Sequence, residues 1–147
     1  MSHEIAVVDA AARPTAVVAA TTTWPEFPAL WPRLLGEVWD CLRAGGVRSG
    51  CPNAMLFLDD VPHVEVGVVL ERPCPLTGRV TASELPAGRV AVTVHRGPYA
   101  GLAAAHEAVA DWCRAQGRQL AGPRWEVYGP HRDDPAELTT EISWLLR

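Results

Sequence analysis

Apolar residues recur at helical spacing in the first third of the chain. Between Phe27 and Leu42 they fall every three or four positions, which is the period of an amphipathic helix. Prolines lie near the start of this stretch, and proline is tolerated only in the first turn of a helix. We therefore expect the regular helix to begin near Trp31 and to end at the glycine pair Gly45 and Gly46.

Alternating and β-branched stretches predict strands before, between and after two helices. The second helix is expected over residues 99–116, where Gly117 closes it. An Asp-Asp-Val-Pro turn at 59–62 joins two of the strands into a hairpin. The expected strands cover residues 16–23, 53–58, 64–70, 79–85, 89–95, 123–129 and 138–146.

The order strand, helix, strand, turn, strand occurs twice, in halves of about residues 1–73 and 74–147. Equivalent positions are 71 or 72 residues apart: Cys41 with Cys113, Gly45 with Gly117, Met55 with Glu126, and Phe57 with Tyr128. Two such units can join edge to edge. We therefore predict one α+β domain over residues 1–147, a duplicated strand-helix-strand-strand unit. Its antiparallel sheet would carry two helices on one side and a ligand groove between the halves.

One carboxylate lies in the middle of the aromatic strand 123–129. Alternation places Glu126 on the same face as Arg124 and Tyr128, with Trp125 on the other face. Such a group must stay in water, find a cation or take up a proton, because desolvating a bare charge is costly. Its equivalent in the first half is Met55, so the groove would hold one carboxylate without a symmetry-related partner. That arrangement suits binding of an apolar cation better than dyad catalysis.

Composition and charge narrow the function classes. The chain is 48% hydrophobic and 20% charged, as in globular proteins, and its net charge of -4 argues against a nucleic-acid surface. The four cysteines lack CxxC spacing, and Ala110 stands where a zincin helix beginning at His106 would need its second histidine. We therefore expect no metal and no cofactor. Without an apolar run of about 18 residues or a signal peptide, we expect a cytoplasmic protein that does not cross a membrane.

Three segments resemble the GyrI-like family, which also forms the effector-binding domain of multidrug-responsive MerR- and AraC-type transcription regulators. They are Val94–Tyr99, Gly122–Tyr128 and Leu138–Ile142. The resemblance implies a pocket between the halves for lipophilic, often cationic, aromatic compounds, with the family's acidic residue at Glu126. It also implies pocket positions at Tyr99, His95, Trp24 and Trp39, while Leu138 stands where some members carry an aromatic residue. No DNA-binding domain flanks this stretch, so we expect a stand-alone member.

Our leading hypothesis is a multidrug-binding protein whose central glutamate holds the ligand's charge. Aromatic and other lining side chains are expected from Trp24, Trp39, Phe57, His95, Tyr99, Tyr128 and Leu138. One alternative is a hydrolase of cyclopropanoid-type electrophilic natural products, with Glu126 as general acid or base. Another is a protein-interaction module like a gyrase-inhibiting relative. A second polar group within hydrogen-bond reach of Glu126 would favour chemistry, and an apolar surround would favour binding.

Overall fold

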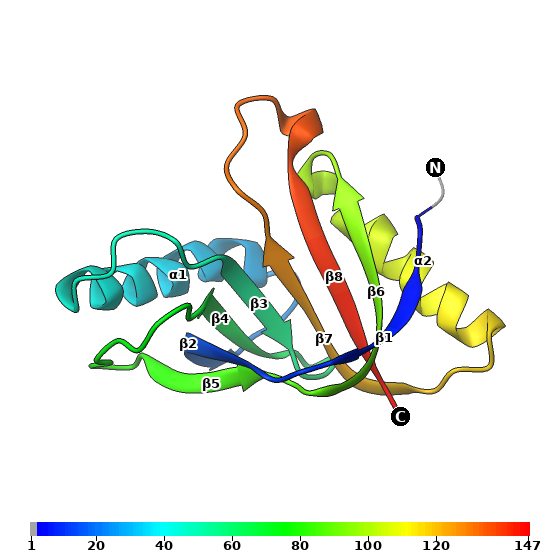
Figure 1. Ribbon diagram of the computed structural model, residues 1–147, viewed down its shortest axis with the longest axis horizontal. Coiled ribbons are helices and arrows are strands. Elements are labelled where there is room, and N and C mark those ends of the chain that lie inside the picture. Colours follow the sequence, from blue (N-terminus) through cyan, green and yellow to red (C-terminus); the bar gives the residue numbers. More distant parts are fainter. Residues whose placement is uncertain (1–2) are drawn as a thin grey trace.

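The computed structural model describes residues 3–147, which form one eight-stranded antiparallel sheet and two helices (Figure 1). The helices are α1 (Phe27–Ala44) and α2 (Leu102–Ala115), with short 3-10 turns η1 (Tyr99–Gly101) and η2 (Pro135–Glu137). The strands are β1 (Ala6–Ala10), β2 (Arg13–Thr21), β3 (Asn53–Phe57), β4 (His63–Val69), β5 (Thr81–Leu85), β6 (Gly88–Arg96), β7 (Leu120–Tyr128) and β8 (Thr139–Leu146). The predicted α+β class is confirmed. None of the helices within residues 3–147 is long and apolar enough to cross a bilayer.

The two halves of the chain meet where β3 pairs with β7. The sheet order is β1-β6-β8-β7-β3-β4-β2-β5, so each half contributes a block of three strands and the blocks join edge to edge. Met55 lies directly opposite Glu126, the pair that the 71-residue offset makes equivalent. A twofold axis passes between equivalent residues, so it runs through this pair. The outer strands are exchanged, because β1 extends the second half and β5 extends the first.

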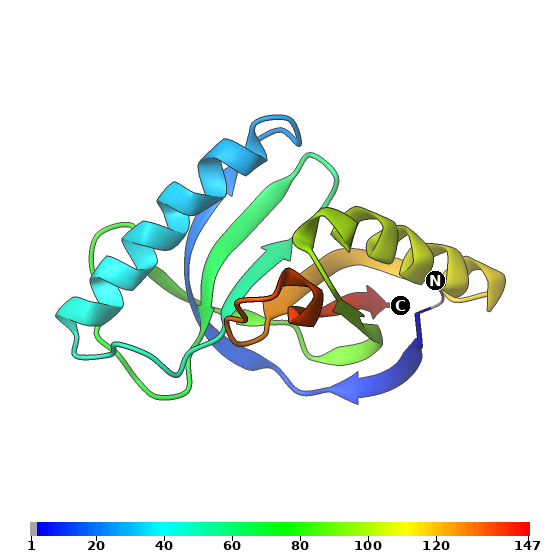
Figure 2. The same ribbon diagram turned by 90° about the horizontal axis from the view of Figure 1, so that it is seen from above.

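Both helices cover the same face of the sheet. Met55, Glu126 and Ile142 are neighbours across β3, β7 and β8, so their side chains share that face. Met55 packs in the core beneath α1, together with Leu34 and Val38. Ile142 packs in the core beneath α2. Figure 2 shows the two helices apart from each other on this face of the sheet.

The opposite face of β7 is apolar, as the alternation predicts. Trp125 and Val127 are buried there in a core that also contains Leu85 of β5 and Val90 of β6. These two strands lie near opposite ends of the sheet order, so the sheet curls until its ends share one core. The curvature leaves the helix-bearing face free to form a pocket.

The first helix begins one turn earlier than the prolines suggest. The structure starts α1 at Phe27 with Pro28 in its first turn, and the helix continues through Pro32. The prediction of a start near Trp31 is therefore wrong. Pro32 removes only the hydrogen bond to the carbonyl of Pro28, and the buried side chains of Phe27 and Leu34 on either side hold the turn against the sheet.

A candidate ligand pocket between the helices

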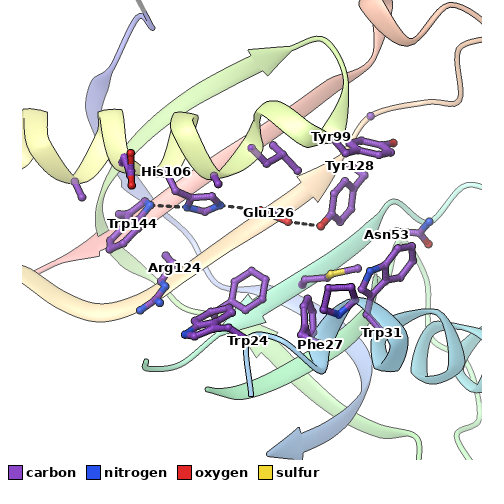
Figure 3. Close-up of a pocket in the computed structure, with 18 of the residues that line it drawn as sticks. Trp24, Phe27, Trp31, Asn53, Tyr99, His106, Arg124, Glu126, Tyr128 and Trp144 are labelled. Carbon is purple, nitrogen blue, oxygen red and sulfur yellow. Dashed lines mark hydrogen bonds and ion pairs between the residues drawn. The ribbon is translucent and has the colours of Figure 1, made fainter. Parts of the chain in front are cut away.

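A cavity of about 1170 Å³ lies over the junction of β3 and β7, between α1 and α2 (Figure 3). Pockets for drug-sized ligands usually measure about 300–1,000 Å³, so the space suits a bulky small molecule. The wall near α1 is aromatic, with Trp24, Phe27, Trp31 and Phe57. The floor and the wall near α2 carry the polar groups described below.

Five of the eight expected site residues line this cavity. They are Glu126, Tyr128, Tyr99, Trp24 and Phe57. Trp24 and Tyr99 are 42% and 49% exposed, which leaves their rings open to a ligand. The ring of Trp24 lies 5.6 Å from that of Phe57, and the ring of Tyr99 lies 5.7 Å from that of Tyr128. The pocket therefore has an aromatic pair on each side of the carboxylate.

The structure places the other three expected residues outside the lining of this cavity. Trp39 lies about 12 Å farther along α1 than Trp31, at 1.5 Å per residue, and lines a second cavity of about 600 Å³. His95 is 8% exposed and packs near the start of α2, with Nε2 3.1 Å from the carbonyl oxygen of Pro98. Leu138 follows η2 at the far end of β8, where its carbonyl accepts from the amide of Gly97.

Glu126 has two side-chain hydrogen-bond partners within the pocket. The Glu126 residue is only 6% exposed. One carboxylate oxygen lies 2.7 Å from Nε2 of His106 on α2, and the other accepts a hydrogen bond from the hydroxyl of Tyr128. On the far side of the imidazole, Nδ1 of His106 accepts the indole N–H of Trp144 at 2.9 Å (Figure 3). Four side chains from α2, β7 and β8 thus form one continuous hydrogen-bond network.

This hydrogen-bond network determines which atoms carry the protons. An indole nitrogen can only donate, so Nδ1 of His106 must be the acceptor, and the ring proton then sits on Nε2, facing Glu126. Burial raises the pKa of Tyr128 well above its usual value, and the adjacent Glu126 charge raises it further, so Tyr128 also remains a neutral donor. Across residues 3–147, His106 is the one basic side chain within ion-pair distance of Glu126. The carboxylate is therefore solvated by neutral donors, and its negative charge has no cation partner.

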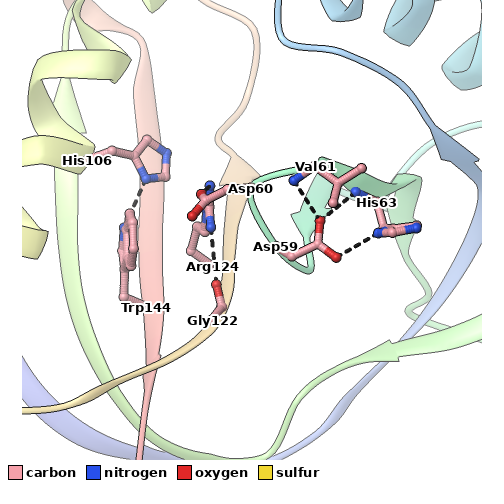
Figure 4. A network of polar contacts seen from close by, with 8 residues as sticks. All are labelled: Asp59, Asp60, Val61, His63, His106, Gly122, Arg124 and Trp144. Atoms are coloured by element: carbon pink, nitrogen blue, oxygen red, sulfur yellow. Dashed lines mark hydrogen bonds and ion pairs between the residues drawn. The ribbon is translucent and has the colours of Figure 1, made fainter.

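A second charged group lies two residues before Glu126 on β7. The Arg124 side chain is nearly buried and donates to Asp60 Oδ1 at 2.6 Å and to the carbonyl of Gly122 at 3.2 Å (Figure 4). Its guanidinium carbon lies 5.6 Å from the ring centre of Trp24 and 5.1 Å from that of Trp144. Two indoles therefore hold Arg124, and one of them also orients His106.

Two residues that are hydrogen-bonded in line with Glu126 were not among the expected lining residues. His106 was considered only as a possible metal ligand, and Trp144 was not assigned to the pocket. Leu102, His106 and Ala110 are four residues apart on α2 and all line the cavity, so a histidine within an apolar helical stripe was the available signal. For Trp144, its cross-strand position opposite Arg124 was the signal, but only the strand register shows it.

The described residues offer no evident place for a metal ion. Between residues 3 and 147, no three His, Cys, Asp or Glu side chains come close enough together to bind one. All four cysteines are free thiols. The chemistry of the pocket therefore rests on a carboxylate, a neutral imidazole, a phenol, a guanidinium and aromatic rings.

Comparison with known families agrees with this architecture. A model described as the GyrI-like small molecule binding domain matches residues 3–147. The chain belongs to the GyrI-like family. Curated protein sequences gave no match to this GyrI-like chain.

Solved structures share the fold of this GyrI-like protein at low sequence identity. The EcmrR C-terminal domain is 19% identical with a TM-score of 0.77, and the alignment covers 100% of this chain and 99% of that one. SAV2435 bound to tetraphenylphosphonium is 15% identical with a TM-score of 0.72, covering 98% and 94%. A hydrolase from Listeria innocua is 11% identical with a TM-score of 0.61, covering 99% and 93%. At these identities the likeness establishes the fold.

Proposed function

We propose that this GyrI-like protein binds lipophilic aromatic cations in the pocket between its helices. One observation carries the proposal: Glu126 is a buried carboxylate whose two partners, His106 and Tyr128, are neutral donors. Those hydrogen bonds solvate the carboxylate without bringing a positive charge to it. A ligand cation that enters the pocket supplies the missing counter-charge beside this buried carboxylate, where charges attract more strongly than in bulk water.

The aromatic wall supports a broad range of ligands. Trp24 and Tyr99 present rings at the edge of the cavity, and Trp31 and Phe57 extend the apolar surface. A cation over an aromatic face gains about 0.5–2 kcal/mol and tolerates variation in position. Such a pocket selects flat or bulky apolar cations as a class. The tetraphenylphosphonium in the related SAV2435 structure is an ion of this kind.

Fluorescence titration with tetraphenylphosphonium tests the proposal, because Trp24 and Trp31 both line the cavity. We expect saturable quenching by the wild type and at least tenfold weaker binding by Glu126→Gln, since a charge-assisted contact of about 1.4 kcal/mol corresponds to that factor. Glu84→Gln is the matched control, because Glu84 is exposed on β5 outside the cavity. Equal affinity of wild type and Glu126→Gln would reject Glu126 as the counter-charge.

A second candidate function is hydrolysis of a strained electrophile such as a cyclopropanoid natural product. The favouring observation is that two polar side chains, His106 and Tyr128, lie within hydrogen-bond reach of Glu126. Glu126 would take a proton from water as the water oxygen bonds to a ring carbon. The ring C–C bond breaks, and its electron pair passes to a conjugated carbonyl oxygen, which is then protonated. The hydrolase from Listeria innocua shares this fold.

Mass spectrometry distinguishes turnover from binding. If the protein is a hydrolase, the wild type converts a cyclopropanoid probe into a product heavier by one water, and Glu126→Gln does not. If it is a binding protein, the probe is recovered unchanged from both. Absence of binding and turnover in the wild type would favour the protein-interaction alternative, for which ligand-independent association with a partner is the signature.

A further inference from the structure

The ligand pocket contains a positive group as well as a negative one. Arg124 and Glu126 point to the same face of β7, about 6.6 Å apart along the strand at about 3.3 Å per residue, and both line the cavity. We propose that the preferred ligands are amphoteric: flat aromatic molecules with a cationic nitrogen beside Glu126 and a carboxylate or carbonyl acceptor at Arg124. This inference rests on the proposed function, since it takes Glu126 as the partner of the cation.

The hydrogen-bond inventory of Arg124 supports an acceptor in the ligand. A guanidinium has five N–H donors. Across residues 3–147 its hydrogen bonds to protein acceptors are two, one to Asp60 and one to the carbonyl of Gly122. Arg124 is only 8% exposed, and its remaining N–H groups have no acceptor among the described residues, so a ligand acceptor that reaches the guanidinium from the pocket side would supply one.

Asp60 does not fully neutralise this guanidinium. The Asp60 side chain is 89% exposed on the turn between β3 and β4, whereas that of Arg124 is 10% exposed. Water and salt screen the charge of an exposed carboxylate more than that of a group inside the pocket. Arg124 therefore presents residual positive charge to a ligand, and a ligand that is only cationic meets repulsion there.

The two indoles restrict how a ligand can reach Arg124. The guanidinium carbon lies over the rings of Trp24 and Trp144, 5.6 Å and 5.1 Å from their centres (Figure 3). All N–H donors of the guanidinium lie in its plane, so a ligand forms hydrogen bonds with Arg124 at the edge of the group. An edge with several N–H groups matches the two oxygens of a carboxylate, and less closely a carbonyl. This geometry favours an anionic or acceptor substituent over another stacked ring.

A matched pair of flat probes tests the inference. The zwitterion 10-methylacridinium-9-carboxylate and its methyl ester share one ring system and one fixed cation, and differ in the carboxylate. We expect wild type to bind the zwitterion at least tenfold more tightly than the ester. In Arg124→Met this preference should fall about tenfold while ester binding is kept or strengthened, since Met fills the space between the indoles without charge.

Two further variants control for charge and folding. Arg118→Met removes an exposed arginine outside the cavity and should leave the preference unchanged. Arg124→Lys keeps the charge without the planar edge and should retain part of the preference even if Arg124→Met is poorly folded.

The outcomes separate this inference from the proposed function. A wild type that binds the ester in a Glu126-dependent way, but shows no preference for the zwitterion, would overturn the role of Arg124 and leave cation binding intact. A preference that survives in Arg124→Met would overturn it as well. Failure of Glu126→Gln to weaken ester binding would instead reject the proposed function.

Discussion

The indole N–H of Trp144 donates to Nδ1 of His106 across 2.9 Å, and this contact fixes the imidazole as the neutral Nε2–H form that faces Glu126. Adding a proton at Nδ1 would set two N–H groups against each other. Trp144 therefore holds the Nε2–H of His106 toward Glu126. It acts on the ligand site through His106, as a positioning residue.

Replacing this indole should weaken cation binding. In Trp144→Phe the ring that packs on Arg124 remains, but the imidazole of His106 loses the donor that fixes its orientation. The ring can then turn away from Glu126, so we expect tetraphenylphosphonium to bind about three- to tenfold more weakly in calorimetric titration. Trp112→Phe, on α2 outside the cavity, serves as control, and equal affinities of Trp144→Phe and wild type would contradict the positioning role.

Tyr128 should make the fold sensitive to alkaline pH. Its pKa is raised well above 10, first by burial and then by the negative charge of Glu126. The folded state thus holds this proton more tightly than the unfolded state, whose tyrosines titrate near 10. The stabilisation is complete below about pH 10 and is lost as pH rises toward the folded pKa. Urea unfolding at stepped pH should show stability falling above pH 10 in wild type and falling less in Tyr128→Phe. Parallel curves of stability against pH for the two proteins would contradict the raised pKa of Tyr128.

Much of the fold follows from the spacing of residues in the sequence. Helical and strand periods predict the element order, and the 71-residue offset predicts the equivalence of Met55 and Glu126, which the sheet places opposite each other. Alternation also predicts that Arg124, Glu126 and Tyr128 share a face. These are local properties, because each depends on the period of one element or on the register of a repeat.

The hydrogen bonds of the site join residues that are far apart in the sequence, and hydrophobic periodicity does not predict such contacts. His106 meets Glu126 from 20 residues away because α2 is rotated to turn that position inward, and Asp60 meets Arg124 across 64 residues through a turn. Similarly, Trp39 has the helical spacing of Trp31 but lies too far along α1 to share its cavity. Helix rotation, helix position and sheet curvature decide these contacts, and tertiary packing sets all three.

Alanine substitutions at Gly67 and Gly36 should change the free energy of unfolding in opposite directions. A Cβ on Gly67 of β4 would lie 1.8 Å from the carbonyl oxygen of Ala16 on β2, so the backbones of the two strands would have to separate. We expect Gly67→Ala to lower the free energy of unfolding by about 3 kcal/mol or more. A Cβ on Gly36 of α1 would meet nothing within 4 Å, so Gly36→Ala should raise it by about 0.5–1 kcal/mol through helix propensity. Chemical denaturation measures both, and a neutral Gly67→Ala would refute the close strand contact.

Asp60 should be required to keep Arg124 away from Glu126. The two groups lie on one face of β7, and the ion pair of 2.6 Å directs the guanidinium toward the turn between β3 and β4. In Asp60→Asn the guanidinium loses its charged partner and can pair with Glu126, the nearest uncompensated carboxylate on that face. We therefore expect tetraphenylphosphonium to bind about three- to tenfold more weakly, because an internal cation then competes for its site.

A second substitution shows whether this competition is the cause. Adding Arg124→Met to Asp60→Asn removes the competing cation, so binding should return to at least the wild-type affinity. The matched control is Asp9→Asn, which breaks the exposed ion pair with Arg89 at the far edge of the sheet and should not change binding. If the double variant binds as weakly as Asp60→Asn alone, the loss comes from the turn itself and not from Arg124. Recovery in the double variant would show that the exposed turn controls the charge available to a ligand in the pocket.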